Sequence, residues 1–502
     1  CCPRCGPQVS LVDNKGRPIP CADPVAETVR RLEAGEIVAV KGLGGFHLAC
    51  DASNGEAVRR LRTRKHRDLK PFAIMVRDMP AAEKVCEMVS NSTDPTSTLT
   101  GPERPILLLP KRAGHGLALE VAPRSPSFGV MLPYTPLHHL LMEGRYPALV
   151  MTSGNISDEP IAHTNLDALN RLVELADCFL LHDRDIHIRT DDSVARMIAG
   201  KLRFLRRSRG YAPFPIALPV QAERAILATG AEWNDTVCIA RGNLAFLSHH
   251  IGDLENVAAY EAFLQAIEHL QNVLATKPSV IACDLHPGYA STRYAEEQHL
   301  PLIRVQHHHA HIASVLAEAG RADKVIGVAF DGLGWAANVK SQISNLKSFK
   351  KTGSLESRGA ELPISNLKSY ATNAELWGGE FLISDLKTYT RVGHLELVPQ
   401  PGGDVCAKRP PRMAYSYLRA ACGGDADKLA SQLLPTLSEA ERNVVAQLIE
   451  RKVNSPMTSS VGRLFDAASA LLGICYKNTY HAQAPMELEA KAFEATDEQG
   501  FY

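Results

Sequence analysis

Residues 305–316, VQHHHAHIASVL, hold four of the chain's 19 histidines within five residues. An apolar run with helical spacing follows. If this run is a helix, His307 and His311 lie one turn apart on the same face, where two imidazoles can share a metal ion. His308 and His309 would then point elsewhere. The alternative is a solvated histidine cluster at a helix start, because this spacing often arises by chance.

Residues 325–334, VIGVAFDGLG, begin fourteen residues after His311 and have the pattern of a buried strand. Such a strand would deliver Asp331 and a glycine turn at its carboxyl end, where open α/β sheets bind their ligands. Two histidines and one carboxylate suit a catalytic metal with open coordination positions, and they accept either zinc or iron. The Asp-Gly turn therefore favours a metal site over a solvated cluster.

Composition limits the class of protein. The length of 502 residues predicts about three domains. Lysine plus arginine and aspartate plus glutamate both number 55, which argues against a surface that coats nucleic acid. The 12 cysteines are scattered singly beyond the first few residues, which indicates a reducing compartment. Without an apolar run of about 18 residues or a signal peptide, we expect a cytoplasmic protein that does not contact a membrane.

The first residues have the pattern of half a zinc site. Cys2 and Cys5 form a zinc knuckle, but a structural zinc needs four ligands and no second pair follows nearby. We therefore expect residues 1–20 to be the remnant of a zinc-finger region and the chain to be a fragment.

The first half contains two segments that could bind phosphate. The strand-like residues 37–40 lead into Lys41 and a glycine turn, whose backbone N–H groups suit phosphate, although an ordinary turn explains the same pattern. Seven cationic side chains lie within residues 59–70, and they form either a solvated helix face or a grip on a triphosphate or an RNA backbone.

Two later segments of this half add polar groups. Ser153 and Asn155 follow a predicted strand and could bond ribose or phosphate, and Arg189 offers a further cation. With the segments above, they describe a concave site for a polyanion. Pro213, Pro215 and Pro219 then mark residues 213–225 as a linker. Predicted strands and helices alternate beyond it, so the fold class is α/β.

Ordered motifs in both halves closely resemble the HypF family of hydrogenase-maturation carbamoyltransferases. In the first half, the motifs of its YrdC-like domain are residues 41–52 (KGLGGFHLACDA), 61–75 (LRTRKHRDLKPFAIM), 132–141 (LPYTPLHHLL), 151–161 (MTSGNISDEPI) and 189–196 (RTDDSVAR). In the second half, the motifs of its transferase domain are residues 248–256 (SHHIGDLEN), 284–292 (DLHPGYAST), 305–314 (VQHHHAHIAS), 330–334 (FDGLG), 377–381 (WGGEF) and 462–473 (GRLFDAASALLG).

The resemblance implies a domain order and a metal site. Residues 21–212 would be the YrdC-like domain, which binds ATP and forms carbamoyl-adenylate. Residues 226–502 would be a carbamoyltransferase domain of the actin/hexokinase-like class with its carboxyl end missing. The implied ligands of its iron or zinc are His307, His311 and Asp331. A further family aspartate, in an Asn-Asp-Gly-Gly motif, has no counterpart before residue 502.

The resemblance also implies a reaction. Carbamoyl phosphate and ATP, accompanied by Mg²⁺, would give carbamoyl-adenylate. The carbamoyl group would then pass to the carboxyl-terminal cysteine of a HypE-type partner for cyanide-ligand synthesis. The residues implied in catalysis and in nucleotide binding are Lys41, Arg62, Lys65, Lys70, Ser153, Asn155, Arg189, Asp331, Gly332 and Gly334. Asp466 is expected to be a buried, paired carboxylate rather than a ligand.

Three departures from the family pattern leave alternatives open. Asn234 replaces a lysine, and His481 lies in an altered motif. The residues at about 336–374 form a repeat-containing insert beside Asp331. The chain could therefore be a decayed copy that binds ATP without transferring the carbamoyl group. A YrdC-type protein that binds double-stranded RNA during tRNA modification is the other alternative.

Overall fold

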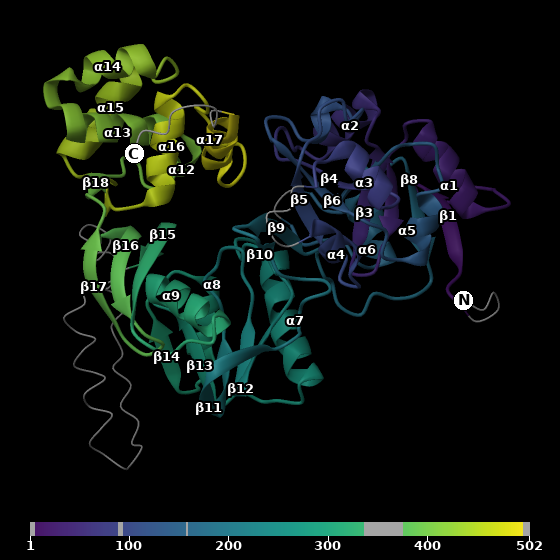
Figure 1. Cartoon of the computed structure of the whole chain (residues 1–502), viewed down its shortest axis with the longest axis horizontal. Coiled ribbons are helices and arrows are strands. Elements are labelled where there is room, and N and C mark those ends of the chain that lie inside the picture. Colours follow the sequence, from purple (N-terminus) through teal and green to yellow (C-terminus); the bar gives the residue numbers. More distant parts are fainter. Residues whose placement is uncertain (1–5, 89–93, 157–158, 336–374, 495–502) are drawn as a thin grey trace. The chain divides into compact units, whose positions relative to one another are not determined.

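The computed structural model of the chain describes residues 6–88, 94–156, 159–335 and 375–494 (Figure 1). Its residue contacts divide it into two compact units: Cys1–Ile216 with Ala222–Ile281, and Ala217–Gln221 with Ala282–Tyr502. Each unit combines sheet and helix, so the expected α/β class is confirmed. No helix in the described part of the chain is both long and apolar enough to cross a membrane.

The first unit contains a ten-stranded mixed sheet. In sheet order its strands are β1 (Val9–Asp13), β8 (Cys178–His182), β2 (Val38–Lys41), β3 (Phe46–Asp51), β7 (Leu149–Ser153), β4 (Ala73–Met75), β6 (Ser127–Met131), β5 (Ile106–Pro110), β9 (Val194–Ile198) and β10 (Lys201–Arg206). The pairs β2–β8, β4–β6 and β5–β9 are parallel, and the other neighbours are antiparallel.

Both faces of the central strands of this sheet are buried, which explains their nearly continuous apolar sequences. The end strand β10 is mostly exposed. Along β2, Val38 and Val40 belong to one hydrophobic core, and Ala39 belongs to the other. The helices of this region are α1 (Pro24–Glu33), α2 (Gly55–Arg64), α3 (Met79–Val85), α4 (Pro95–Thr100), α5 (Pro136–Leu141) and α6 (Asn165–Arg171). Asp23 starts α1, because its carboxylate accepts hydrogen bonds from two backbone N–H groups of the first turn.

The predicted linker at residues 213–225 is wrong for most of its length. Strand β11 (Ile216–Ala228) occupies it and belongs to a four-stranded sheet in the order β12-β11-β13-β14, with β12 at Cys238–Leu247, β13 at Val280–Asp284 and β14 at Leu302–Val305. A proline removes one N–H donor, but it does not prevent its neighbours from pairing. Helix α7 (Val257–Val273) lies between β12 and β13 in the chain.

The second unit contains a sheet in the order β15-β16-β19-β18, with β17 paired to β16. These strands are β15 (Val325–Trp335), β16 (Leu376–Ser384), β17 (Tyr389–His394), β18 (Val398–Pro399) and β19 (Met457–Thr458). Its helices are α8 (Ala290–Glu297), α9 (His307–Glu318), α12 (Val405–Lys408), α13 (Pro410–Cys422), α14 (Ala426–Leu433), α15 (Glu439–Glu450), α16 (Val461–Leu471) and α17 (Gln483–Glu494).

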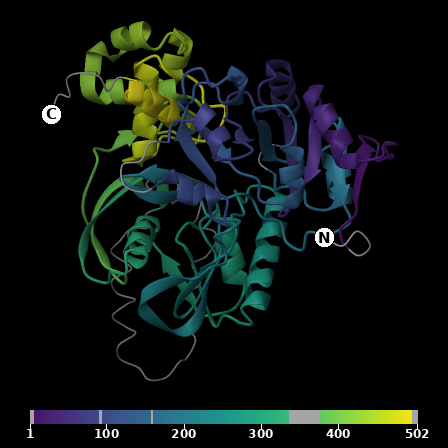
Figure 2. The ribbon, with the colours of Figure 1, turned by 45° about the vertical axis from the view of Figure 1, so that its right-hand side comes forward.

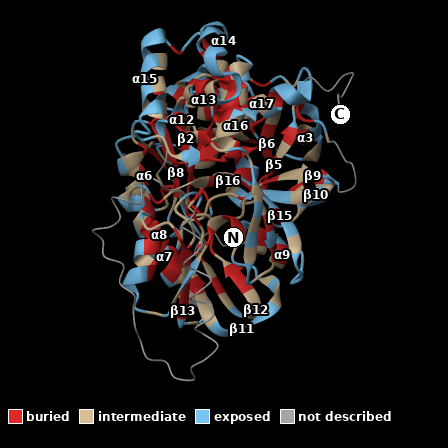
Figure 3. Cartoon of the chain, turned by 90° about the vertical axis from the view of Figure 1, so that its left-hand side faces the viewer, coloured by how far each residue is buried: buried red, intermediate tan, exposed pale blue. Residues whose placement is uncertain are grey.

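Helices α12 to α17 form one group in both ribbon views (Figure 1, Figure 2). Met413 and Tyr415 of α13, together with Ala467 and Ala470 of α16, contribute to its apolar core. The outer helices α14 and α15 are largely exposed (Figure 3). This arrangement confirms that Asp466 of α16 is a buried, paired carboxylate, since it is fully buried and lies 2.8 Å from the guanidinium of Arg463.

Candidate metal centre and nucleotide site

The helix and the strand predicted around the histidine cluster are both present. The strand is not fully buried as predicted, because Ile326, Val328 and Phe330 are exposed on one face. Gln306 caps α9 by accepting a hydrogen bond from the backbone N–H of His309 at 2.9 Å. The glycine turn expected at the end of the strand is instead a bulge within β15, since its pairing with β16 shifts between Phe330 and Gly334. A bulge redirects side chains, and this one contains Asp331.

His307, His311 and Asp331 converge as the sequence predicts. One ligand atom from each lies within 4.8 Å of the other two. Asp331 Oδ2 lies 3.0 Å from His307 Nε2 and 3.4 Å from His311 Nε2. The two Nε2 atoms are 3.3 Å apart. Lone-pair donors that meet in this way fit a divalent metal such as zinc or iron.

The charges of this cluster are strongly coupled. Although burial opposes the change, the contacts with His307 and His311 lower the pKa of Asp331. Burial also lowers the pKa of His307, but Asp284 and Asp331 outweigh it and raise that pKa to about 9. The cluster therefore holds a carboxylate beside a histidine that binds a proton tightly.

Asp284 is the residue of this centre that the sequence reasoning did not assign. Its Oδ2 lies 2.8 Å from Nδ1 of His307, and its side chain is only 3% exposed. Its Oδ1 accepts a hydrogen bond from the backbone N–H of His286 at 2.8 Å. A carboxylate behind a histidine fixes the tautomer that leaves the other ring nitrogen free to bind metal. The sequence could have indicated Asp284, because it lies at the end of the β13 strand and within the 284–292 motif.

The other two histidines point elsewhere, as expected. His308 is fully buried, and burial lowers its pKa to about 4. His309 Nε2 lies 2.9 Å from the backbone oxygen of Asp385. Gly334 packs against His308, because a Cβ at this position would lie 2.1 Å from the imidazole. Gly332 has open space instead, and its oxygen accepts a hydrogen bond from Ser460 Oγ, at the start of α16, at 2.7 Å.

The first unit brings three of the predicted nucleotide-site residues together. Nζ of Lys65 lies 2.6 Å from the backbone oxygen of Ser153 and 2.5 Å from that of Asn155. It also lies 2.7 Å from Oδ1 of Asn155. Ser153 Oγ donates to Asn155 Oδ1 at 2.7 Å. Burial, with Arg67 and Lys70 nearby, lowers the pKa of Lys65 well below its usual value, while the three acceptor oxygens favour its ammonium form.

Lys41 ends β2 and begins the predicted glycine turn. Its Nζ donates to the His182 oxygen at 3.0 Å, and burial lowers its pKa. Gly42 N–H donates to the Gly45 oxygen at 2.8 Å and closes the turn. A Cβ on Gly44 would lie 2.3 Å from the Thr190 oxygen, so this close packing requires glycine. The turn and the Arg189 segment are therefore adjacent.

Arg62 has a different environment from the one predicted. Its guanidinium donates to the backbone oxygens of Glu120 and Val121 and to those of Arg67, Asp68 and Lys70. These bonds make Arg62 a positioning residue for the 67–70 loop and argue against direct contact with phosphate. Lys70 itself is exposed.

The remaining cations of this run also face protein groups. Arg59 pairs with Glu120, and Arg64 lies 2.8 Å from Asp177. Arg67 donates to Thr152 Oγ1 at 3.2 Å. The run is therefore not an open basic surface.

A buried network that the sequence reasoning missed supports the same region. His47 Nε2 lies 2.9 Å from Asp192 Oδ2, and Arg209 Nε donates to Asp192 Oδ1 at 2.7 Å. The guanidinium of Arg209 lies 3.5 Å from the centre of the Tyr134 ring. Although burial opposes the change, Arg209 and His47 lower the pKa of Asp192. The network links β3 to the segment that carries Arg189.

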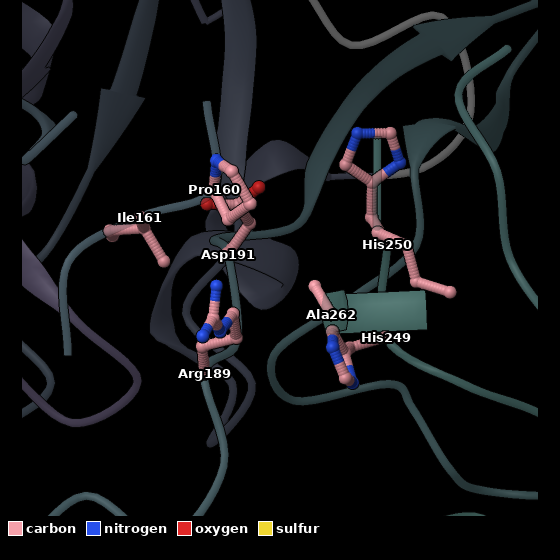
Figure 4. A pocket seen from close by; sticks show the side chains of 8 residues that line it. Pro160, Ile161, Arg189, Asp191, His249, His250 and Ala262 are labelled. Atoms are coloured by element: carbon pink, nitrogen blue, oxygen red, sulfur yellow. The ribbon is translucent and has the colours of Figure 1, made fainter. Parts of the chain in front are cut away.

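Arg189 lines a shallow recess that is open to solvent and has room for about one water molecule (Figure 4). The lining residues are Pro160, Ile161, Arg189, Asp191, His249, His250, Ile251 and Ala262.

Cys2, Cys5 and the insert at 336–374 lie outside the described residues, so the predicted zinc knuckle stays a prediction.

Three family models match the chain. Residues 30–208 match the model described as "Telomere recombination" and residues 221–318 the model "HypF Kae1-like domain". Residues 369–502 match the model "Carbamoyltransferase, Kae1-like Domain, second subdomain".

Curated proteins extend these matches over nearly the whole chain. Carbamoyltransferase HypF2 of Cupriavidus necator is 42% identical over 506 residues, covering 96% of this chain and 57% of that protein. Carbamoyltransferase HypF of Rhizobium leguminosarum is 41% identical, with coverage of 93% and 56%. The chain belongs to the HypF carbamoyltransferase family. It spans little more than half the length of these HypF relatives.

Solved HypF structures have the same fold. A full-length HypF in a phosphate- and nucleotide-bound form has a TM-score of 0.85 and 39% identity, covering 98% of this chain and 59% of that one. A second structure, described as "T.kodakarensis HypF", has a TM-score of 0.87 and 34% identity, with coverage of 100% of this chain and 62% of that one. The expected succession of a YrdC-like domain and a HypF-type transferase domain is therefore confirmed.

The departure at Asn234 from the HypF pattern has a local explanation. Its φ is +48°, a left-handed conformation that asparagine adopts more readily than lysine. Its backbone N–H donates to Asp253 Oδ1 at 2.7 Å. Asparagine thus suits the turn after β11, where the resemblance implies a lysine.

Proposed function

We propose that the chain transfers carbamoyl groups in [NiFe]-hydrogenase maturation. Carbamoyl phosphate supplies carbamate, whose oxygen attacks the α-phosphorus of ATP. Carbamoyl-adenylate forms, and pyrophosphate leaves. The thiolate at the carboxyl end of a HypE-type partner then attacks the carbamoyl carbon and displaces AMP, leaving a thiocarbamate. The observation that carries the proposal is the convergence of His307, His311 and Asp331 in a chain 42% identical to a carbamoyltransferase.

Residues of the first unit support the adenylation half. Lys41 is a buried cation that would stabilise charge developing on phosphate oxygens, whereas Lys65 donates to three protein oxygens and would act on the nucleotide through Ser153 and Asn155. Lys65 joins Ser153 and Asn155 into one polar group, which can orient the nucleotide. Arg62 fixes the 67–70 loop and so places Lys70 near the same site. ATP would bring Mg²⁺ with it.

Residues of the second unit support the transfer half. His307, His311 and Asp331 would hold the divalent iron or zinc, which would supply Lewis-acid polarisation when bound. Asp284 faces Nδ1 of His307 and keeps a proton there, so that Nε2 presents a lone pair once its own proton has left. The short bond from Ser460 to the Gly332 oxygen holds the bulge in place beside Asp331.

Two further parts of the proposal concern RNA and location. RNA binding has little support from residues 59–70, because Arg59 and Arg64 pair with carboxylates and Arg62 donates to backbone oxygens, which leaves Lys70 as an exposed cation. A reducing, cytoplasmic location stays a prediction. It is supported by the nine cysteines of the described part of the chain, all of which are free thiols.

Transfer of ¹⁴C from carbamoyl phosphate to a HypE-type partner tests the proposal. A separately supplied acylphosphatase releases carbamate from carbamoyl phosphate, so that lack of carbamate cannot be mistaken for lack of transfer. A partner with serine in place of its last cysteine shows where the label goes. Label on the cysteine alone, lost in His311→Ala and kept in Asp323→Asn, is expected. AMP production without label on the partner would instead support the decayed-copy alternative.

A further inference from the structure

His308 lies between the two elements that carry the candidate metal ligands. It belongs to the first turn of α9, directly after His307, and its side chain is fully buried. Its imidazole packs against Gly334 of β15, where a Cβ would lie 2.1 Å from the ring. Helix α9 provides His307 and His311, whereas β15 provides Asp331. The ring is therefore a spacer between the helix and the strand that bring these ligands together.

The contact of this ring lies where the bulge of β15 ends. The pairing of β15 with β16 shifts between Phe330 and Gly334, and it resumes with Gly334 opposite Trp377. The centre of the His308 ring lies 6.0 Å from that of the buried Trp377 ring. The ring of His308 thus packs on the first regular pair after the bulge. The pairs at the two ends of a bulge determine where its side chains point, and Asp331 is one of those side chains.

The orientation of the ring is fixed by Gln306. Gln306 Oε1 accepts the backbone N–H of His309 at 2.9 Å, so the NH₂ group of the same amide must point the other way. That NH₂ group faces Nδ1 of His308 at 3.2 Å. Nδ1 therefore accepts, and the neutral ring carries its proton on Nε2. One buried amide thus links the cap of α9 to the angle of the His308 ring.

The other nitrogen of this ring makes no hydrogen bond. Nε2 of His308 is buried and has no partner within the described residues. An unpaired buried N–H group is costly, so an apolar side chain would fill the same space at less cost. What a histidine offers and an apolar residue lacks is the Nδ1 acceptor, through which Gln306 sets the angle of the ring. The chain therefore bears a cost at this position that simple packing does not require.

We propose that His308 is a positioning residue of the metal centre, whose ring sets the separation of His307 on α9 and Asp331 on β15. The assignment rests on the metal centre of the proposed function, and it adds a residue that binds neither metal nor substrate. Nε2 of His307 lies 3.0 Å from Oδ2 of Asp331. A ligand that is displaced or loosely held binds the ion more weakly and changes the geometry around it.

Two substitutions of His308 test the assignment on the full chain, with cobalt(II) as the probe. His308→Asn removes the ring and keeps its hydrogen bond, because the asparagine oxygen can accept from Gln306. His308→Leu fills a similar volume without an unpaired N–H group, so its stability should stay close to that of the native chain. Each variant should nevertheless lose about tenfold in cobalt affinity, and its d–d absorption bands should shift, since the ligands are no longer held at their native separation. The bands report the geometry at the ion without any catalysis.

His309→Asn is the matched control. His309 is the next residue of the same turn, and its Nε2 faces the backbone oxygen of Asp385 at 2.9 Å instead of the bulge. This variant should be less stable to urea than the native chain, yet it should keep the native cobalt affinity and bands. A merely structural role for His308 predicts the same result for His308→Asn.

The possible results separate the assignment from the proposed function. If either folded variant of His308 keeps the native affinity and bands, the assignment is wrong while the metal centre stands. An equal loss of affinity in His309→Asn would also overturn the assignment, because any buried histidine of this turn would then have the same effect. If the native chain binds no cobalt, the metal centre of the proposed function fails, and the assignment fails with it.

Discussion

Replacing Asp284 by asparagine tests how the metal centre is held. Asparagine has nearly the shape of aspartate, so its oxygen can stay on the His286 N–H that Asp284 Oδ1 now holds at 2.8 Å. Its amide NH₂ then faces His307 Nδ1, where the carboxylate Oδ2 lies 2.8 Å away in the native chain. An NH₂ group donates, so His307 must accept at Nδ1 and carry its proton on Nε2. That atom is the one that faces Asp331 and His311.

The magnitude follows from this reversal of the tautomer. The 3% exposure of the Asp284 side chain leaves little room for water to compensate. Changes of this kind behind a metal-binding histidine lower metal affinity about 10- to 100-fold. At about 1.4 kcal/mol for each factor of ten, the loss is about 1.4 to 2.8 kcal/mol of binding free energy.

Cobalt absorbance and zinc competition measure this affinity directly. His311→Ala removes a ligand and should lose more affinity than Asp284→Asn. Asp323→Asn changes an aspartate of the same unit whose side chain is 56% exposed, and it should stay within about twofold of the native affinity. Native affinity in Asp284→Asn would refute the tautomer argument, and native affinity in His311→Ala would refute the metal centre itself.

Three other substitutions test separate parts of the structure. Gly334→Ala should lower the free energy of unfolding by about 1–3 kcal/mol, because its Cβ would meet an imidazole at 2.1 Å; Gly332→Ala, with no atom within 4 Å, should change it by less than about 0.5 kcal/mol, and urea unfolding compares the two. Burial raises the pKa of Asp466 to about 6, so the native state binds this proton more tightly than the unfolded chain, and stability should fall as pH rises from about 4 to 6. Asp466→Asn should lack that fall, and parallel pH curves for the two proteins would contradict it. Lys65→Met should raise the KM for ATP at least tenfold, since the Lys65 ammonium holds the backbone oxygens of Ser153 and Asn155. An unchanged KM in a folded variant would exclude this role.

The convergence of the candidate metal ligands was predictable because its signals are local. His307 and His311 are separated by one helical turn, and the pattern of a buried strand places Asp331 near its end. Asp284 was missed because 23 residues separate it from His307, and only the folded chain brings β13 beside the start of α9. Single-sequence spacing contains no information on such a contact.

The candidate nucleotide site was less predictable. The charge of its cations alone indicates either exposure to solvent or contact with phosphate. Val58, Leu61, Arg62 and Lys65 occupy positions i, i+3, i+4 and i+7, and all four are buried on one face of the α2 region. The helical period therefore indicated that Arg62 and Lys65 point inward. The residues at 216–225 were misassigned for a different reason, since the prolines were given more weight than the apolar residues between them.

ATP–pyrophosphate exchange dependent on carbamoyl phosphate is the most direct test of the central claim. The native chain, with an acylphosphatase supplied separately, is compared with Lys41→Ala, which removes a buried cation at the glycine turn. The account predicts exchange that requires carbamoyl phosphate and is lost in Lys41→Ala. A native chain that binds ATP but catalyses no exchange would contradict it.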